Sequence, residues 1–274
     1  MTIEWKSGGT GFVDAGGKRL EIRMHGPSPS EATTIVLLHE GLGSAELWRD
    51  FPAKLAEATG LGVFAYSREG YGNSDPVTLP RPLDYMERHA IEVMPGILNA
   101  LSPRRVILLG HSDGASIAAL YLGNFQDPRV RGLVLLAPHF FTEDGGLAAI
   151  AAAKQMYETG DLRTRLAKYH RDVDNAFRGW NDAWLNPEFK NWNIEECIDY
   201  VRVPVLAVQG KQDQYGTSAQ LDALESRLYS PFEAVLLDDC RHSPFIDQPV
   251  ETTAAIADFV AQLERLETET VRVA

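Results

Sequence analysis

The sequence of 274 residues predicts an α/β protein with a mostly parallel sheet of eight strands and helices on both faces. Two observations lead to this prediction. Short apolar runs of strand length alternate with longer helical segments, as they do where helices connect the parallel strands of a sheet. One such run leads directly into a serine flanked by glycines and then into a helical segment, which is typical of a tight strand-to-helix turn.

The predicted elements follow one another in a regular order. Two strands around the turn signal Gly16-Gly17 predict a hairpin, and buried strands then alternate with helices. The predicted strands are residues 11–14, 20–24, 33–38, 62–66, 104–109, 130–137, 203–208 and 234–237. The predicted helices are residues 45–59, 84–101, the segment after Ser112, 217–229 and 249–265.

The alternation pauses in the second half of the chain. Residues 140–200 carry helical signals and no convincing strand, and they include Trp180, Trp184 and Trp192. We therefore predict a core of residues 1–139 and 201–274, interrupted by a helical insertion at 140–200.

Composition narrows the range of partners. A formal net charge of −12 argues against nucleic acid and anionic membranes. No apolar run approaches the length of a membrane span, and residues 1–6 do not resemble a signal peptide. Cys197 and Cys240 make no disulfide framework. These features predict a cytoplasmic protein, and they leave open whether it is a monomer or a homodimer.

Residues 110–114, Gly-His-Ser-Asp-Gly, fit the pattern G-x-S-x-G. The turn in this pattern is strained and crowded, and glycines allow the backbone to bend there. The pattern predicts that Ser112 is a nucleophile. The alternative is a serine that caps a helix in an ordinary turn.

A serine nucleophile needs a base, and the base needs an orienting acid. Asp213 follows the predicted strand 203–208, and His242 follows the predicted strand 234–237. Because ligand sites collect at the carboxyl ends of parallel strands, all three residues are expected at one edge of the sheet. The alternatives are a turn acid at Asp213 and a surface histidine at His242.

Other titratable residues near these positions are weaker candidates. Asp238 and Asp239 lie close to His242 in sequence, but on the strand end that delivers the histidine. The His111 side chain is expected to point away from the nucleophile into packing. His139 lies at a strand end, where it could line a pocket.

An oxyanion formed by acyl transfer needs preorganised N–H donors. We expect one from the backbone of Asp113, at the start of the helix that follows the serine. The second is expected from the Gly41 amide, in the glycine-rich loop 39–44. This loop is not a phosphate loop, because it lacks Gly-Lys-Ser or Gly-Lys-Thr.

Together these residues resemble the α/β-hydrolase superfamily, over about residues 10–265. The segment 67–75, Ser-Arg-Glu-Gly-Tyr-Gly-Asn-Ser-Asp, is similar to a loop of that family. The resemblance implies an α/β-hydrolase fold, Ser112 as nucleophile, Asp213 as orienting acid and His242 as base. It also implies an oxyanion hole of the Gly41 and Asp113 amides, with no cofactor and no metal.

The chain departs from the family pattern beside this loop. Glu40 stands where the family commonly has glycine, and its carboxylate would oppose negative charge unless it is paired. We expect Arg68 as its partner. Glu69 stands where a proline is common, which we expect to be of little consequence. Ser112, at the turn between strand and helix, distinguishes the chain from epoxide hydrolases and haloalkane dehalogenases, which have an aspartate at this position.

The insertion falls where the superfamily inserts a cap. The resemblance therefore implies that Trp180 and Trp184 help to roof an apolar pocket, to which Glu40 and His139 could also belong. The alternative is that the aromatic rings hold the cap together.

The predicted function is a capped, carboxylesterase-like serine hydrolase that cleaves a small-molecule carboxylic ester or thioester. Two alternatives remain at this point. One is a hydrolase of carbon–carbon bonds in diketones from aromatic breakdown, which uses the same triad. The other is a non-catalytic ligand-binding protein.

Overall fold

The computed structural model describes residues 3–273, with side chains described as far as residue 266. Its sheet has eight strands in the order β1-β2-β4-β3-β5-β6-β7-β8, so the predicted fold class is confirmed. β2 is antiparallel to β1 and β4, and the other pairs are parallel. The strands are β1 (Thr10–Ala15), β2 (Lys18–His25), β3 (Thr34–Leu38), β4 (Gly62–Tyr66), β5 (Val106–His111), β6 (Val130–Leu136), β7 (Val205–Gly210) and β8 (Phe232–Leu237).

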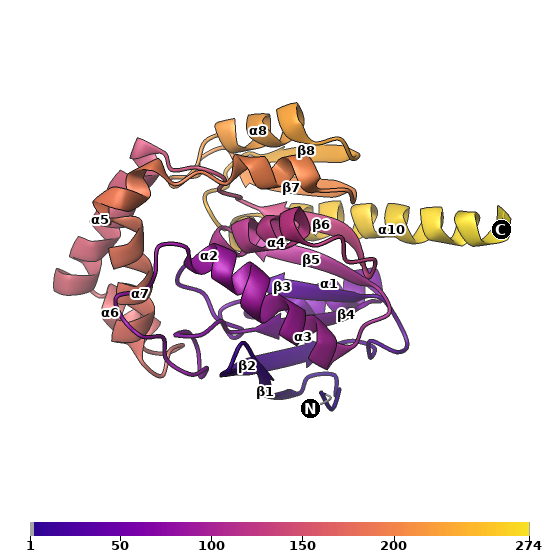
Figure 1. The fold of residues 1–274 in the computed structure, drawn as a ribbon, viewed down its shortest axis with the longest axis horizontal. Helices are drawn as coiled ribbons and strands as arrows, with labels where there is room; N and C mark the ends of the chain where they lie inside the picture. The colour runs from indigo at the N-terminus through magenta and orange to yellow at the C-terminus, as the bar shows by residue number, and fades with distance from the viewer. Residues whose placement is uncertain (1–2, 274) are drawn as a thin grey trace.

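Helices cover both faces of the sheet (Figure 1). The longer ones outside the insertion are α1 (Phe51–Thr59), α3 (Met94–Leu101), α4 (Asp113–Asn124), α8 (Ala219–Arg227) and α10 (Pro249–Val273). Short helices are α2 (Tyr85–Arg88), the π-helical turn η1 (His89–Val93) and α9 (Pro244–Asp247). α1 and α10 pack together on one face, while α3 and α4 lie on the other.

The alternating side chains of the buried strands separate two hydrophobic clusters. In β3, Val36 and Leu38 belong to the cluster beneath α3 and α4. Ile35 and Leu37 belong to the cluster beneath α1 and α10. This alternation follows from the two-residue period of a strand.

The first predicted helix is shorter than expected. Residues 45–50 form successive turns, and α1 begins only at Phe51. Arg49 has a φ of 55°, which a right-handed helix does not allow. Pro52 then favours a helix start, because it lies in the first turn, where no backbone N–H donor is needed.

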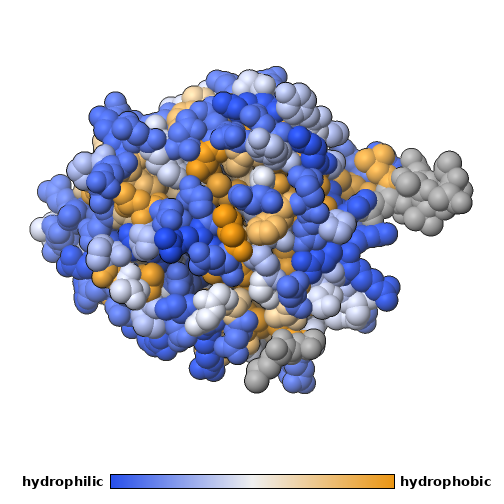
Figure 2. Space-filling view, viewed as in Figure 1, coloured by the Kyte–Doolittle hydropathy of each residue, from blue (hydrophilic) through white to orange (hydrophobic). Residues whose placement is uncertain are grey.

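The insertion, residues 140–200, is helical, and its first three helices lie to one side of the sheet (Figure 1), while its last helical segment packs against α4. It contains α5 (Asp144–Thr159), α6 (Leu162–Leu166), α7 (Val173–Trp184), η2 (Pro187–Asn191) and η3 (Glu195–Tyr200). A single antiparallel bridge between Phe141 and Asn193 joins its two ends. The face that carries α2 and α3 is largely hydrophilic, with hydrophobic areas near its middle and over the insertion (Figure 2). None of the described helices combines the length and apolarity needed to cross a membrane.

Candidate active site

Ser112 occupies a strained turn between β5 and α4. Its backbone has φ 53° and ψ −119°, a conformation that L-residues rarely adopt. Two hydrogen bonds hold the turn. The Ser112 amide donates to the Leu136 carbonyl at 2.9 Å, and the Ser112 carbonyl accepts from the Ala115 amide at 2.8 Å. Backbone strain of this kind collects at functional sites.

The two glycines of the motif allow close backbone contacts. A Cβ atom at Gly110 would overlap the Gly114 carbonyl, and one at Gly114 would overlap the Leu38 carbonyl at the end of β3. The G-x-S-x-G pattern therefore reflects the packing of α4 against the ends of β3 and β5.

Asp213 and His242 are in direct contact. Nδ1 of His242 lies 2.9 and 2.8 Å from the two carboxylate oxygens of Asp213. Since a carboxylate accepts, Nδ1 carries the proton, and in the neutral form of the ring Nε2 carries the lone pair that a base needs. Burial by itself raises the pKa of Asp213, but the hydrogen bonds from His242 and the Tyr215 amide lower it below its ordinary value.

The loops that carry these two side chains are bonded to each other. The Gln212 amide donates to the Cys240 carbonyl at 2.9 Å, and the Cys240 amide donates to Oε1 of Gln212 at 3.0 Å. A Cβ at Gly210 would overlap the carbonyls of Cys240 and Arg241, so glycine permits this approach.

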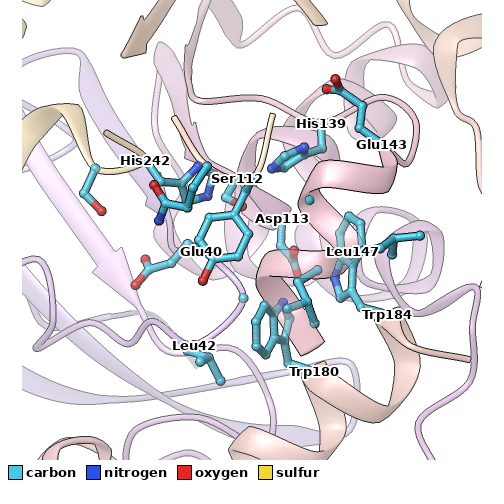
Figure 3. Close-up of a pocket in the computed structure, with 16 residues that line it drawn as sticks. Glu40, Leu42, Ser112, Asp113, His139, Glu143, Leu147, Trp180, Trp184 and His242 are labelled. Carbon is cyan, nitrogen blue, oxygen red and sulfur yellow. The ribbon is translucent and has the colours of Figure 1, made fainter. Parts of the chain in front are cut away.

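Ser112 and His242 line the same cavity, which has a volume of about 190 Å³ (Figure 3). Within the described residues, the Ser112 hydroxyl makes no hydrogen bond to the His242 ring. In many hydrolases this contact becomes short only when substrate binds. The arrangement thus places Ser112 and His242 at one cavity without a hydrogen bond between their side chains.

The two predicted oxyanion donors also line the cavity. Gly41 and Asp113 both border it, and neither backbone amide has a hydrogen-bond acceptor among the described residues. The Asp113 amide lies at the first turn of α4, where an N–H has no acceptor within the helix.

The prediction that the Glu40 carboxylate pairs with Arg68 is wrong. Oε2 of Glu40 lies 3.4 Å from Nδ1 of His111, whereas Arg68 binds the Glu40 backbone carbonyl at 3.0 Å. Burial works to raise the pKa of Glu40, but the His111 ring lowers it below its ordinary value. The sequence does not reveal this pair, because Glu40 lies in the loop after β3 and His111 ends β5, about 70 residues later.

His111 is buried in packing, as predicted, with an additional polar role. Its ring contacts Phe245 at a centroid distance of 5.5 Å. Its Nε2 donates to the backbone carbonyl of His242 at 2.7 Å. Glu40 and His111 therefore support the loop that carries the proposed base.

His139 borders the cavity beside His242, with ring centroids 5.5 Å apart. Burial lowers the pKa of His139 to about 3, with a further contribution from the nearby His242 ring. The ring is therefore neutral at physiological pH and adds no positive charge next to the proposed base.

Some aromatic residues of the insertion line the cavity, and others pack against one another within the insertion. Trp180 and Trp184 line the cavity from α7 (Figure 3). Phe189 and Trp192 stack on each other at 5.3 Å and pack beside Trp184. Phe177 stacks on Tyr157 at 3.7 Å within the insertion.

Several lining residues were not singled out from the sequence. Tyr215, two positions after Asp213, lies beside His242, with ring centroids 4.7 Å apart and the ring planes tilted by 59°. Leu147 and Ile150, three residues apart on one face of α5, complete the apolar wall. Their spacing is a sequence signal, but it is shared by every amphipathic helix.

Comparisons with known proteins agree with this architecture. An "Epoxide hydrolase 2" of Siraitia grosvenorii is 32% identical over 119 residues, which are 43% of this chain and 36% of the relative. A "Proline iminopeptidase" of Lactobacillus crispatus (strain ST1) is 29% identical over 106 residues, 39% of this chain and 36% of the relative. These matches span little more than a third of the relatives' length.

The solved structure of the enol-lactonase from Burkholderia xenovorans LB400 superposes with a TM-score of 0.72 and 18% identity, over 92% of this chain and 100% of that one. At this identity the likeness concerns the fold. Residues 35–256 match the profile described as "Alpha/beta hydrolase family". With that match over most of the sheet, the chain belongs to the α/β hydrolase family.

Proposed function

We propose that this protein is a serine hydrolase that cleaves a carboxylic ester or thioester through an acyl-enzyme on Ser112. One observation carries the proposal. The hydrogen-bonded pair Asp213–His242 and the strained Ser112 meet at one cavity, which also presents the Gly41 and Asp113 amides, neither of which has an acceptor in the described part of the chain. These are the parts that acyl transfer needs.

In the proposed first half-reaction, Oγ of Ser112 attacks the acyl carbonyl while Nε2 of His242 removes its proton. Asp213 holds the imidazole in the required tautomer and stabilises the imidazolium. The amides of Gly41 and Asp113 donate to the developing oxyanion. Collapse of the tetrahedral intermediate breaks the bond to the alcohol or thiol, which takes its proton from His242.

In the second half-reaction, water replaces the departed alcohol or thiol. His242 removes a proton from the water, which attacks the acyl carbon, and the second tetrahedral intermediate releases the carboxylic acid and Ser112. Trp180 and Trp184 cover the cavity, whose volume of about 190 Å³ favours a small or medium acyl group. This roof also limits the access of bulk water.

The names of the relatives include activities other than ester hydrolysis. Epoxide hydrolases, one of which is similar to part of this sequence, use an aspartate at the strand-to-helix turn, where this chain has Ser112. Because part of the chain is similar to a proline iminopeptidase, a substrate panel should include amides beside esters and thioesters. The same triad serves the carbon–carbon bond hydrolases, which remain the alternative for the same site.

A fluorophosphonate probe followed by peptide mass spectrometry tests the proposal. We expect labelling of Ser112 in the wild type, and we expect Ser112→Ala to lose turnover of p-nitrophenyl butyrate by about 10⁴- to 10⁶-fold. Ser218→Ala, an exposed serine at the start of α8, is the matched control. Retention of wild-type turnover by Ser112→Ala would refute the assignment.

The probe also separates the alternatives. Labelling of Ser112 without hydrolysis of any ester or thioester would favour cleavage of carbon–carbon or amide bonds. A folded protein that is not labelled would favour a binding protein.

A further inference from the structure

Arg68 is an unusually placed arginine. It lies just after β4, its side chain is only 2% exposed, and it is surrounded by the loops that form the candidate site. Arginine is almost never fully buried unless its charge is paired. Its contacts therefore indicate what the guanidinium does there.

The Arg68 side chain reaches the backbone on one side of the proposed oxyanion hole and the Asp113 carboxylate on the other. Nη1 donates to the His39 carbonyl, and Nη2 donates to the Glu40 carbonyl at 3.0 Å. Nη2 also lies 3.7 Å from Oδ2 of Asp113. The planar fork of a guanidinium suits two neighbouring acceptors, which a single ammonium does not match.

The Glu40 carbonyl belongs to the same peptide group as the Gly41 amide. In a planar trans peptide, the C=O and the N–H point in opposite directions. Because Arg68 binds the Glu40 carbonyl from one side of this peptide, the Gly41 N–H points to the opposite side, away from Arg68. Gly41 itself borders the cavity. A hydrogen bond to the carbonyl also polarises the N–H of that peptide.

His39 supports the same peptide group. Its Nε2 accepts from the Arg68 amide at 2.9 Å, so its Nδ1 carries the proton and donates to the Glu40 carbonyl at 2.7 Å. Burial, together with the Arg68 charge, lowers the pKa of His39 well below its ordinary value, which keeps this tautomer neutral. The Glu40 carbonyl thus receives two side-chain donors, in addition to the Gly43 amide, which donates to it at 3.1 Å.

We propose that Arg68 is a positioning residue of the oxyanion hole. It fixes the Glu40–Gly41 peptide plane and places a positive charge behind the segments that supply both amide donors. The proposal rests on the serine-hydrolase function proposed above. It differs from a purely structural role, in which Arg68 would only neutralise Asp113 and stack on Tyr71, 5.1 Å from the ring centroid.

Arg81 offers a matched control. It is 7% exposed and lies over the same Tyr71 ring at 5.0 Å. Its hydrogen bonds go to the Tyr71 hydroxyl and the Glu69 carbonyl. Arg81→Ala therefore removes a buried guanidinium from the same ring and leaves the Glu40–Gly41 peptide with its donors.

The experiment compares turnover of p-nitrophenyl butyrate with the inhibition constant of an alkylboronic acid. The boronate forms a tetrahedral adduct with the serine and places an oxygen in the oxyanion hole. In Arg68→Ala we expect kcat to fall by about 10- to 100-fold and the boronate inhibition constant to rise by a similar factor, with KM changed less than about threefold. Guanidinium chloride well below denaturing concentrations should restore part of the kcat of this variant.

Arg68→Lys covers the case in which Arg68→Ala does not fold, because lysine retains a positive charge beside Asp113. We expect Arg68→Lys to keep a lowered kcat and a weakened boronate affinity, since one ammonium cannot hold both carbonyls. Arg81→Ala should keep the kcat and the boronate affinity of the wild type. Wild-type kcat and boronate affinity in folded Arg68→Lys would overturn the proposal, as would equal losses in Arg81→Ala.

The fluorophosphonate experiment separates a failure of the serine-hydrolase proposal from a failure of the Arg68 proposal. If fluorophosphonate does not label Ser112 in the wild type, the serine-hydrolase proposal fails and Arg68 has no oxyanion hole to position. If Ser112 is labelled and the wild type turns over ester, loss of the expected Arg68 effects refutes the Arg68 proposal alone.

Discussion

The indole of Trp180 lies directly over the backbone of Gly41. A Cβ atom added at Gly41 would overlap Nε1 of Trp180. Gly41 belongs to the loop after β3 and Trp180 to α7 of the insertion, so one van der Waals contact joins the proposed oxyanion loop to its roof. Residue 41 must be glycine for the two to approach this closely.

Gly41→Ala should lower kcat by about 10²- to 10³-fold, because the added methyl group displaces the Gly41 amide or the Trp180 ring. Adding Trp180→Ala should recover part of the loss, which a double-mutant cycle on p-nitrophenyl butyrate measures. Gly145→Ala is the control, because a Cβ there meets no atom within 4 Å. No recovery in the double variant would contradict the overlap as the cause.

Asp213→Asn should reduce kcat by about 10⁴-fold, because an amide can force the wrong tautomer on His242. Steady-state kinetics on p-nitrophenyl butyrate, with thermal melts to confirm folding, measure the effect. Asp238→Asn is the matched control, since Asp238 lies close to His242 in sequence but is 77% exposed and pairs with Lys211. A comparable loss in Asp238→Asn would count against Asp213 as the orienting acid.

Glu40→Gln should lower the free energy of unfolding by about 1 to 3 kcal/mol, because His111 loses its carboxylate partner in a buried setting. Its kcat should change by less than about tenfold, since the proposed triad and both proposed amide donors stay in place. Urea unfolding and steady-state kinetics measure both quantities. Glu46→Gln, which removes a surface carboxylate 45% exposed, should leave stability nearly unchanged. A large loss of kcat at full stability would instead place Glu40 in the chemistry.

The pH dependence of stability should report the burial of His139. Its folded-state pKa of about 3 lies below the ordinary value of 6.5, so the unfolded chain takes up the proton first as pH falls. The stabilising contribution is complete above pH 6.5 and decreases toward pH 3, by up to about 1.4 kcal/mol per pH unit. The free energy of unfolding of His139→Gln should therefore fall less steeply between pH 6.5 and 4. Identical slopes in variant and wild type would show that His139 titrates alike in both states.

Much of the fold was predictable because it depends on local patterns. The apolar runs of the strands and the glycines at residues 110 and 114 predict a parallel sheet with a tight turn at Ser112, and the structure contains both. The first helix was predicted too long because the positive φ of Arg49 depends on the path of its neighbours rather than on the type of residue.

The sequence by itself determined which residues reach the edge of the sheet. Asp213 and His242 each follow a strand, and topology alone carries them to the side of Ser112. Their positions are predictable because each strand end and the loop after it are local features of the chain.

Only the tertiary structure decided which side chains pair there. Glu40 meets His111 rather than Arg68, and Arg68 instead holds the backbone behind Gly41. Such pairings depend on small differences in distance between loops that are far apart in sequence, where several partners of suitable charge lie within reach. Local propensity contains no information about these distances, because the packing of the whole domain sets them.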